Sequence, residues 1–172
     1  CVAMRNGPFC LFWFALSVLV IVLDHYTKAL ATSELQYGQP VRVFWWLNFT
    51  LQHNTGAAFS FLSDAGGWQR YFFSIAAGTI SAALAVWLYL MPRGQWLLAF
   101  GLALILGGAL GNMWDRVVLG YVVDFISVHY EHHMFPAFNI ADSAISIGAV
   151  CMLLDSFLYR DRAMIGARTG DR

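Results

Sequence analysis

The chain has 172 residues, of which 59% are hydrophobic, 16% aromatic and only 12% charged. This composition excludes an ordinary soluble domain and indicates an integral membrane protein. The ten basic and ten acidic residues give a formal net charge of zero, so no overall field attracts nucleic acid, and we expect no nucleic-acid partner.

Four apolar segments are long enough to cross a bilayer, since a spanning helix needs about 20 residues. We place these spans at about 9–30, 69–90, 95–115 and 136–158, within a single domain that covers residues 1–172. The last span holds only twelve uncharged residues after Asp142, from Ser143 to Leu154. We therefore expect its helix to begin near Pro136 and to include that carboxylate.

A cleaved signal peptide is the competing interpretation of the first apolar segment, with residues 29–31 as an A-x-A cleavage site. Asp24 and Lys28, however, separate the apolar run from that site, and three more spans follow. We therefore expect a retained span.

The third segment carries Ala103, Gly107 and Gly111 at intervals of four, a small-xxx-small pattern that lets helices approach closely. The alternative is that glycine is simply frequent in membrane helices. If the pattern mediates packing, the end of this helix, from Asn112 to Arg116, lies against its neighbours.

Two longer segments, 31–68 and 116–135, separate the spans on one side of the membrane. All odd positions from Val41 to Leu51 are apolar, and this period of two predicts one β-strand over these residues. Phe44 and Trp46 make its second face partly apolar, which is typical of a strand at the membrane interface. The sequence thus predicts an all-α membrane fold, a four-transmembrane-helix bundle with a small β-cradle outside the bilayer.

The basic residues predict the orientation of the bundle. Six lie on the side that holds the termini and the 91–95 loop, namely Arg5, Arg93, Arg160, Arg162, Arg168 and Arg172, and four lie on the other side, namely Lys28, Arg42, Arg70 and Arg116. Because basic residues gather on the cytoplasmic side, we expect both termini in the cytoplasm. Asp124 and Asp142 then face the outer side of the membrane.

Asp124 and Asp142 are the candidate catalytic residues. A carboxylate at membrane depth is costly, and two that lie close together cannot both ionise readily, so the pair shares a proton. Such a pair supplies a base that activates water and an acid that protonates a leaving amine, as in aspartic proteases. The alternative is that Asp142 caps or pairs within the bundle while Asp124 is a surface residue.

Further polar residues lie near the same side of the membrane. Asp24 and Lys28 are four residues apart and predict an ion pair, as a structural bridge or in contact with substrate. Asp115 and Arg116 are either a structural pair, or Arg116 neutralises one of the aspartates. Three asparagines can bind an extended peptide backbone or orient a carboxylate, namely Asn54, Asn112 and Asn139.

Other classes of function are less well supported. His129, Glu131, His132 and His133 contain no H-E-x-x-H pair, so we interpret them as a solvated loop and expect neither metal nor cofactor. A proton-coupled membrane carrier is the main rival, because intramembrane carboxylates also relay protons. A non-catalytic assembly factor with structural charge pairs is a second rival.

Five motifs, in order, resemble those of the bacterial lipoprotein signal peptidases (signal peptidase II), over residues 9–160. They are Val22–Lys28, Asn54–Phe59, Gly107–Arg116, Val122–Phe125 and Phe135–Ser143. The resemblance implies an intramembrane aspartyl peptidase with a periplasmic β-cradle, in the bacterial inner membrane. It would cleave the signal peptide from a prolipoprotein before its diacylglyceryl-modified cysteine.

The resemblance also implies roles for individual residues. Asp124 and Asp142 would be the catalytic dyad, and the residues around the site would be Asp24, Lys28, Asn54, Gly56, Asn112, Arg116 and Asn139. The cyclic depsipeptide globomycin would block the site. We expect the enzyme to work as a monomer among membrane lipids, with the aromatic strand and residues 117–135 closing over the substrate.

Overall fold

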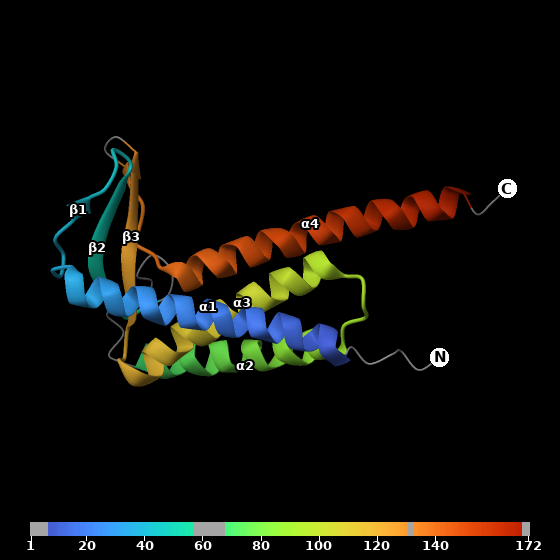
Figure 1. Cartoon of the computed structure of the whole chain (residues 1–172), viewed down its shortest axis with the longest axis horizontal. Helices are drawn as coiled ribbons and strands as arrows, with labels where there is room; N and C mark the ends of the chain where they lie inside the picture. The colour runs from blue at the N-terminus through green and yellow to red at the C-terminus, as the bar shows by residue number, and fades with distance from the viewer. Residues whose placement is uncertain (1–6, 57–67, 131–132, 170–172) are drawn as a thin grey trace.

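The computed structural model describes residues 7–56, 68–130 and 133–169. Its elements follow the order α1 (Gly7–Glu34), β1 (Val41–Arg42), β2 (Leu47–Asn54), α2 (Trp68–Leu90), α3 (Trp96–Val118), β3 (Val122–Tyr130), β4 (His133–Met134) and α4 (Ile140–Thr169). The helices lie side by side, and the sheet stands across one end of the bundle (Figure 1). α1 begins and α4 ends at the opposite end, which also holds the turn between α2 and α3 (Figure 1).

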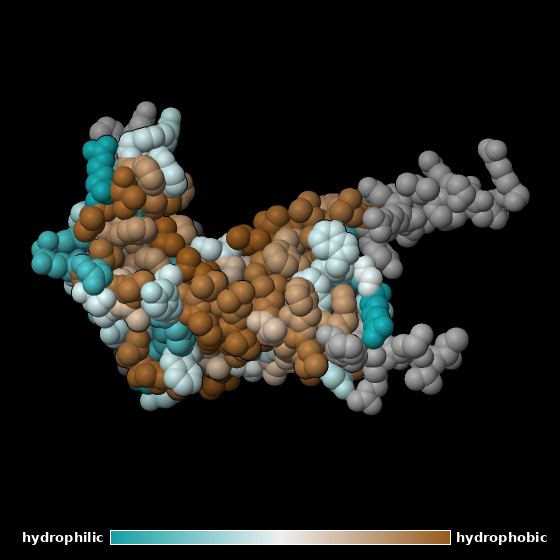
Figure 2. Space-filling model, viewed as in Figure 1, coloured by the Kyte–Doolittle hydropathy of each residue, from teal (hydrophilic) through white to brown (hydrophobic). Residues whose placement is uncertain are grey.

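The helices confirm the predicted membrane bundle. Within the described residues, four helical stretches are long and apolar enough to cross a bilayer, namely Phe9–Glu34, Arg70–Leu90, Trp96–Val118 and Ile140–Leu158. Hydrophobic side chains cover the middle of the bundle, and hydrophilic ones gather at its two ends (Figure 2). α3 is the central helix, since 56% of its spanning window is buried inside the protein, against at most 28% for the other three.

Small residues of α3 let both neighbouring helices approach its backbone. A Cβ atom at Gly107 would lie 2.7 Å from the backbone oxygen of Ser17 in α1, and one at Gly108 would overlap the backbone oxygen of Ala141 in α4. Ser17 Oγ also donates to the backbone oxygen of Ala103 at 2.9 Å. The small-xxx-small stripe therefore mediates helix packing, which was one of the two interpretations of this pattern.

The sheet is antiparallel, with strand order β1-β2-β3-β4. The prediction of one strand from Val41 to Leu51 is wrong, because the chain reverses over residues 43–46 and pairs Val41 with Phe49. The backbone N–H groups of Val43 and Phe44 both donate to Leu47 O at 3.0 Å and close this turn. An alternating pattern does not reveal a reversal when both arms of the hairpin alternate.

A β-bulge in β2 determines which side chains meet at the bundle. Phe49 pairs with Ile126, but Gln52 pairs with Asp124, so β2 uses one residue more than β3 over this interval. A shift by one residue moves each side chain to the other face of the sheet. The bulge thereby puts Asn54 on the face of Asp124, whereas the register of Phe49 and Ile126, continued unchanged, would put it on the opposite face.

The prediction that the fourth helix begins near Pro136 is wrong, since α4 begins at Ile140. Phe138 instead forms a β-bridge with Ile126, donating and accepting backbone hydrogen bonds of 3.0 and 2.9 Å. These bonds hold the preceding residues extended along β3, out of helical conformation. The helix reaches spanning length at its other end, where it continues past Asp155 to Thr169, so Asp142 lies in its first turn.

Candidate active site

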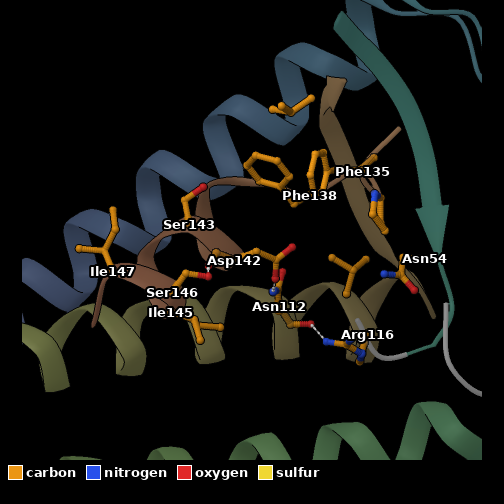
Figure 3. A pocket seen from close by; sticks show the side chains of 14 residues that line it. Asn54, Asn112, Arg116, Phe135, Phe138, Asp142, Ser143, Ile145, Ser146 and Ile147 are labelled. Carbon is orange, nitrogen blue, oxygen red and sulfur yellow. Dashed lines mark hydrogen bonds between the residues drawn. The ribbon is translucent and has the colours of Figure 1, made fainter. Parts of the chain in front are cut away.

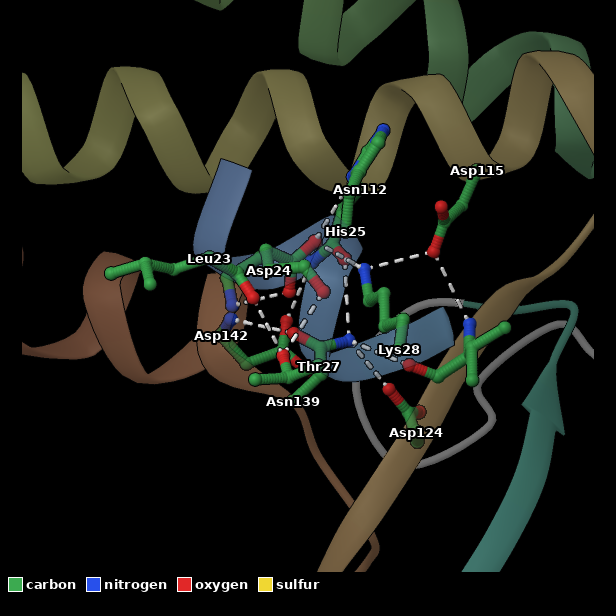
Figure 4. Close-up of polar contacts among 12 residues, drawn as sticks. Leu23, Asp24, His25, Thr27, Lys28, Asn112, Asp115, Asp124, Asn139 and Asp142 are labelled. Atoms are coloured by element: carbon green, nitrogen blue, oxygen red, sulfur yellow. Dashed lines mark hydrogen bonds and ion pairs between the residues drawn. The ribbon is translucent and has the colours of Figure 1, made fainter. Parts of the chain in front are cut away.

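Asn139 begins the site by capping α4. It precedes the first helical residue, and its Oδ1 accepts the backbone N–H of Asp142 at 2.9 Å, as an N-cap asparagine does. The backbone N–H of Ala141 is bound by Asp24 Oδ1 from α1 at 2.9 Å. Two first-turn N–H groups that a helix leaves without partners are thus bound, which fixes the turn that carries Asp142 (Figure 4).

Asp124 enters the same site from β3, and its side chain is only 2% exposed. Its Oδ1 accepts from Asn139 Nδ2 at 2.7 Å, and its Oδ2 accepts from Asn54 Nδ2 at 3.1 Å. Burial, together with the charge of Asp142, raises the pKa of Asp124 to about 7, although the two amide donors lower it. Asp124 can therefore exchange a proton near neutral pH.

Two asparagines join the carboxylates. Asn112 Nδ2 donates to Asp142 Oδ1 at 2.8 Å, and Asn112 Oδ1 accepts from Asn139 Nδ2 at 3.2 Å. Asn139 in turn donates to Asp124, so a continuous chain of hydrogen bonds runs between the two acids (Figure 4). Residues from α3, β3 and the start of α4, far apart in the sequence, thus form one polar cluster.

A buried ion cluster lies behind the asparagines. The predicted Asp24–Lys28 pair is present, with 2.6 Å between Oδ2 and Nζ. Asp115 also binds Lys28, with 2.8 Å between Oδ2 and Nζ. Its ion pair is therefore with α1, and the interpretation that paired Asp115 with its neighbour Arg116 is wrong. Consecutive helical residues point about 100° apart, so Asp115 faces α1 while Arg116 faces away from it.

A cavity of about 730 Å³ opens beside Asp142, between α3, α4 and the sheet (Figure 3). Arg116 lies at its rim, where Nη2 donates to the backbone oxygen of Gly56 at 3.0 Å and the Gly56 N–H donates to Asn54 Oδ1 at 3.0 Å. The polar residues that line the cavity include Asn54, Asn112, Arg116, Asp142, Ser143 and Ser146, and the apolar ones include Val122, Val128, Phe135, Phe138, Ile145 and Ile147. Such a lining fits an extended peptide with apolar side chains.

The structure thus brings together all ten residues predicted for the site. The sequence reasoning missed Ser143 and Ser146, which line the cavity beside Asp142. Ser146 lies four residues after Asp142, a helical spacing that could have found it, whereas the position of Ser143 next to Asp142 gives no such signal. Glu131 and His132 of the predicted histidine-rich loop lie outside the described residues, and within those residues no cluster of His, Cys, Asp or Glu is placed to hold a metal ion.

Known proteins are similar to this chain over most of its length. The family model described as signal peptidase (SPase) II matches residues 16–158. A lipoprotein signal peptidase of Acinetobacter baumannii is 59% identical over 150 residues, which are 87% of this chain and 85% of the relative. Another, of Pseudomonas aeruginosa, is 54% identical over 147 residues, which are 84% of this chain and 87% of the relative.

Two solved structures of a bacterial membrane enzyme share the fold. One has a TM-score of 0.74 and 27% sequence identity and covers 100% of this chain and 97% of its own. The other has a TM-score of 0.72 and 30% identity, with 90% and 96% covered. The similarity therefore extends over the helices and the sheet together.

Proposed function

Because the chain belongs to the signal peptidase II family, we propose that it is an aspartic endopeptidase that removes signal peptides from lipid-modified prolipoproteins. The observation that carries this proposal is the pair of acids joined through Asn112 and Asn139, with Asp124 buried in β3 and Asp142 half-buried in the lining of an open cavity. Cleavage would occur on the N-terminal side of the diacylglyceryl-modified cysteine.

In the proposed reaction one acid is ionised and the other is protonated. The ionised carboxylate takes a proton from water as the water oxygen attacks the scissile carbonyl carbon, and the protonated acid donates to the carbonyl oxygen. The tetrahedral intermediate then collapses: the acid that is now ionised takes back a proton from one hydroxyl of the intermediate, the C–N bond breaks, and the amine nitrogen leaves with the proton of the other acid. One water is consumed, and the products are a carboxylate on the signal peptide and a free amine on the lipidated cysteine.

The cavity lining supports a peptide substrate held in the plane of the membrane. Phe135, Phe138 and Ile147 offer apolar contacts to small side chains, while Asn54 and Arg116 offer hydrogen bonds to a peptide backbone. The cavity lies at the outer end of α4, so the acyl chains of the substrate can remain in the lipid beside the bundle. A cyclic depsipeptide such as globomycin would bind in the same place.

The remaining predicted residues support the site in different ways. Gly56 belongs to the rim through its bond with Arg116. Asp24, Lys28 and Asp115 form a buried cluster, with Asp24 fully buried and Lys28 4% exposed, and we assign them to structure and not to substrate contact. We propose that the protein works as a monomer surrounded by membrane lipids, because one chain supplies both acids and the whole cavity lining.

We place the protein in the bacterial inner membrane with both termini in the cytoplasm and the active site on the periplasmic side. This assignment rests on the excess of basic residues at the end of the bundle that holds the α2–α3 turn, as described above. The sheet and the start of α4 lie at the opposite end (Figure 1), and they carry Asp124 in β3 and Asp142 in the first turn of α4. A translocated precursor would therefore meet the site after its lipidated cysteine has left the cytoplasm.

Cleavage of a lipidated precursor by Asp124→Asn and Asp142→Asn variants tests the proposal. Each variant should lose activity by about 10³-fold, the order of magnitude of a lost proton transfer, while still unfolding cooperatively on heating. Asp155→Asn is the matched control, because it changes another α4 carboxylate near the opposite end of the span. Parent-level cleavage by a folded variant of either dyad residue would refute the mechanism.

The same variants separate the peptidase from the rival carrier. The parent should cleave the lipidated precursor and leave the unlipidated one intact, and vesicles that contain it should conduct no protons above background. Proton flux that requires Asp124 and Asp142, without any cleavage, would instead support the carrier.

A further inference from the structure

We propose that Lys28 is a positioning residue, which holds the side-chain amide of Asn112 in the orientation that donates to Asp142. This inference rests on the proposed peptidase function and deepens it. Lys28 is absent from the lining of the substrate cavity, so we assign its role to the side chains that it holds and not to contact with substrate.

The Lys28 ammonium group has its three donors directed at three acceptors. Nζ lies 2.6 Å from Asp24 Oδ2, 2.8 Å from Asp115 Oδ2 and 2.9 Å from Asn112 Oδ1. Asp24 belongs to the same helix as Lys28, and Asp115 lies on α3 close to Asn112. The two carboxylates thus anchor the ammonium group from both helices, so that its third N–H points at Asn112 (Figure 4).

The orientation of Asn112 needs a second donor besides Asn139. Asn139 Nδ2 carries two N–H groups but has three acceptors within reach, namely Asp124 Oδ1 at 2.7 Å, Val123 O at 3.2 Å and Asn112 Oδ1 at 3.2 Å. At any moment one acceptor lacks its hydrogen, and the shortest contact goes to Asp124. Of the two donors to Asn112 Oδ1, Lys28 is charged and lies closer, at 2.9 Å against 3.2 Å for Asn139. Lys28 therefore supplies most of the preference for this orientation.

The reversed orientation of Asn112 would be unfavourable while Lys28 is in place. Its Nδ2 would then face Lys28 Nζ and Asn139 Nδ2, donor against donor, and its Oδ1 would face Asp142 Oδ1. Without Lys28, the side-chain amide of Asn112 could reverse, and a protonated Asp142 could donate to Asn112 Oδ1. The acid proton would then be held in that hydrogen bond and would not be available to the substrate. Lys28 therefore keeps Asp142 Oδ1 an acceptor and leaves the acid proton to the other oxygen.

A double-mutant cycle on cleavage of a lipidated precursor tests this assignment. Lys28→Met and Asn112→Ala should each lower kcat by about 100-fold, as expected when a catalytic group loses its geometry, with KM changed less than about 3-fold. If Lys28 acts through Asn112, the double variant should be within about 3-fold of Asn112→Ala alone. Multiplicative losses of kcat, or a change in KM alone, would overturn the proposal.

Ser17→Ala is the matched control for a merely structural role. Ser17 is also buried in the α1–α3 interface, where its hydroxyl binds Ala103 O, but it lies away from the site. This variant should lower the melting temperature while kcat stays within about 2-fold of the parent. If the Lys28→Met variant does not fold, the cycle is run in an Asp115→Asn background, which removes one of the two carboxylates left without a counter-charge.

Asn112→Asp gives a second, independent measurement. The new carboxylate still accepts from Lys28 and Asn139, so the variant should fold, but it has no N–H to donate to Asp142 and should lose about 100-fold in kcat. Parent-level activity of Asn112→Asp would overturn the proposal. If the parent itself cleaves no lipidated precursor, the proposed function fails. If the parent is active but the losses of kcat from Lys28→Met and Asn112→Ala multiply, only the role of Lys28 is refuted.

Discussion

Replacing Asn139 with alanine and with serine separates its two roles, as cap of α4 and as donor to Asp124. Alanine removes both, since Oδ1 accepts from Asp142 N and Nδ2 donates to Asp124 Oδ1. The cap is worth about 1 kcal/mol, and a buried hydrogen bond to a charged group about 2 kcal/mol, so Asn139→Ala should cost about 3 kcal/mol of unfolding free energy. Serine keeps the cap, so Asn139→Ser should cost about 2 kcal/mol.

Activity should depend on the hydrogen bond that Asn139 donates to Asp124 and not on its role as the cap of α4. The Asn139 hydrogen bond lowers the pKa of Asp124, so both variants should move that pKa above about 7 and shift the corresponding limb of the pH–rate profile to higher pH. The two variants should therefore differ in stability and agree in pH profile. The assays are unfolding in mixed detergent micelles and precursor cleavage between pH 5 and 9, ranges chosen to be about two units either side of that pKa.

Two results would contradict this reasoning. A serine variant that is no more stable than the alanine variant would show that the cap contributes nothing to the start of α4. A serine variant with the parent's pH profile and kcat would show that the amide donated to Asp124 has no role in the reaction.

Three further predictions follow from the site geometry. Gly108→Ala should displace the first turn of α4, because the added methyl overlaps Ala141 O, and should lower kcat by about 100-fold; parent-level cleavage would refute the packing argument. Asp124 has a pKa raised from 3.8 to about 7, so the unfolded chain releases this proton at lower pH than the native protein does. Stability should then fall as pH rises from about 4 to 7, by up to about 1.4 kcal/mol per unit, and Asp124→Asn should abolish this contribution in unfolding measurements. Asn54→Ala removes a donor to Asp124 Oδ2 and should shift the pH–rate profile upward, whereas Asn54→Asp, which also lacks the N–H, should not restore it.

The helical part of the fold was predictable because each span is a local property of the chain. Runs of about 20 apolar residues identify helices without knowledge of their neighbours. The start of α4 was not predictable in this way, since Pro136 resembles a first helical residue but the backbone around it pairs with β3. The hydrogen bonds to β3, a strand distant in the sequence, determine the conformation of this segment more strongly than the local preference of Pro136 for a first helical turn.

The candidate site was predictable in its members but not in its contacts. Asp142 attracts attention as a carboxylate within an apolar run, and the four-residue spacing of Asp24 and Lys28 predicts their ion pair. The bond of Lys28 with Asp115 spans two helices, so no spacing reveals it. Which way the amides of Asn112 and Asn139 point depends on hydrogen-bond donors and acceptors from α1, β3 and α4, and only their arrangement in space determines it.

The bulge between Phe49 and Gln52 divides β2 into two halves, and each half has its own register with β3 and its own alternation of side chains between the two faces of the sheet. A residue added to or removed from the turn at 43–46 changes the tip of the sheet but leaves the alternation beyond the bulge untouched. The tip can thus vary in length and composition, for instance to suit different precursors, while Asn54 keeps its place beside Asp124. The same insertion between Gln52 and Asn54 would turn Asn54 away from the acid, so tolerance to insertions should change abruptly at Gln52.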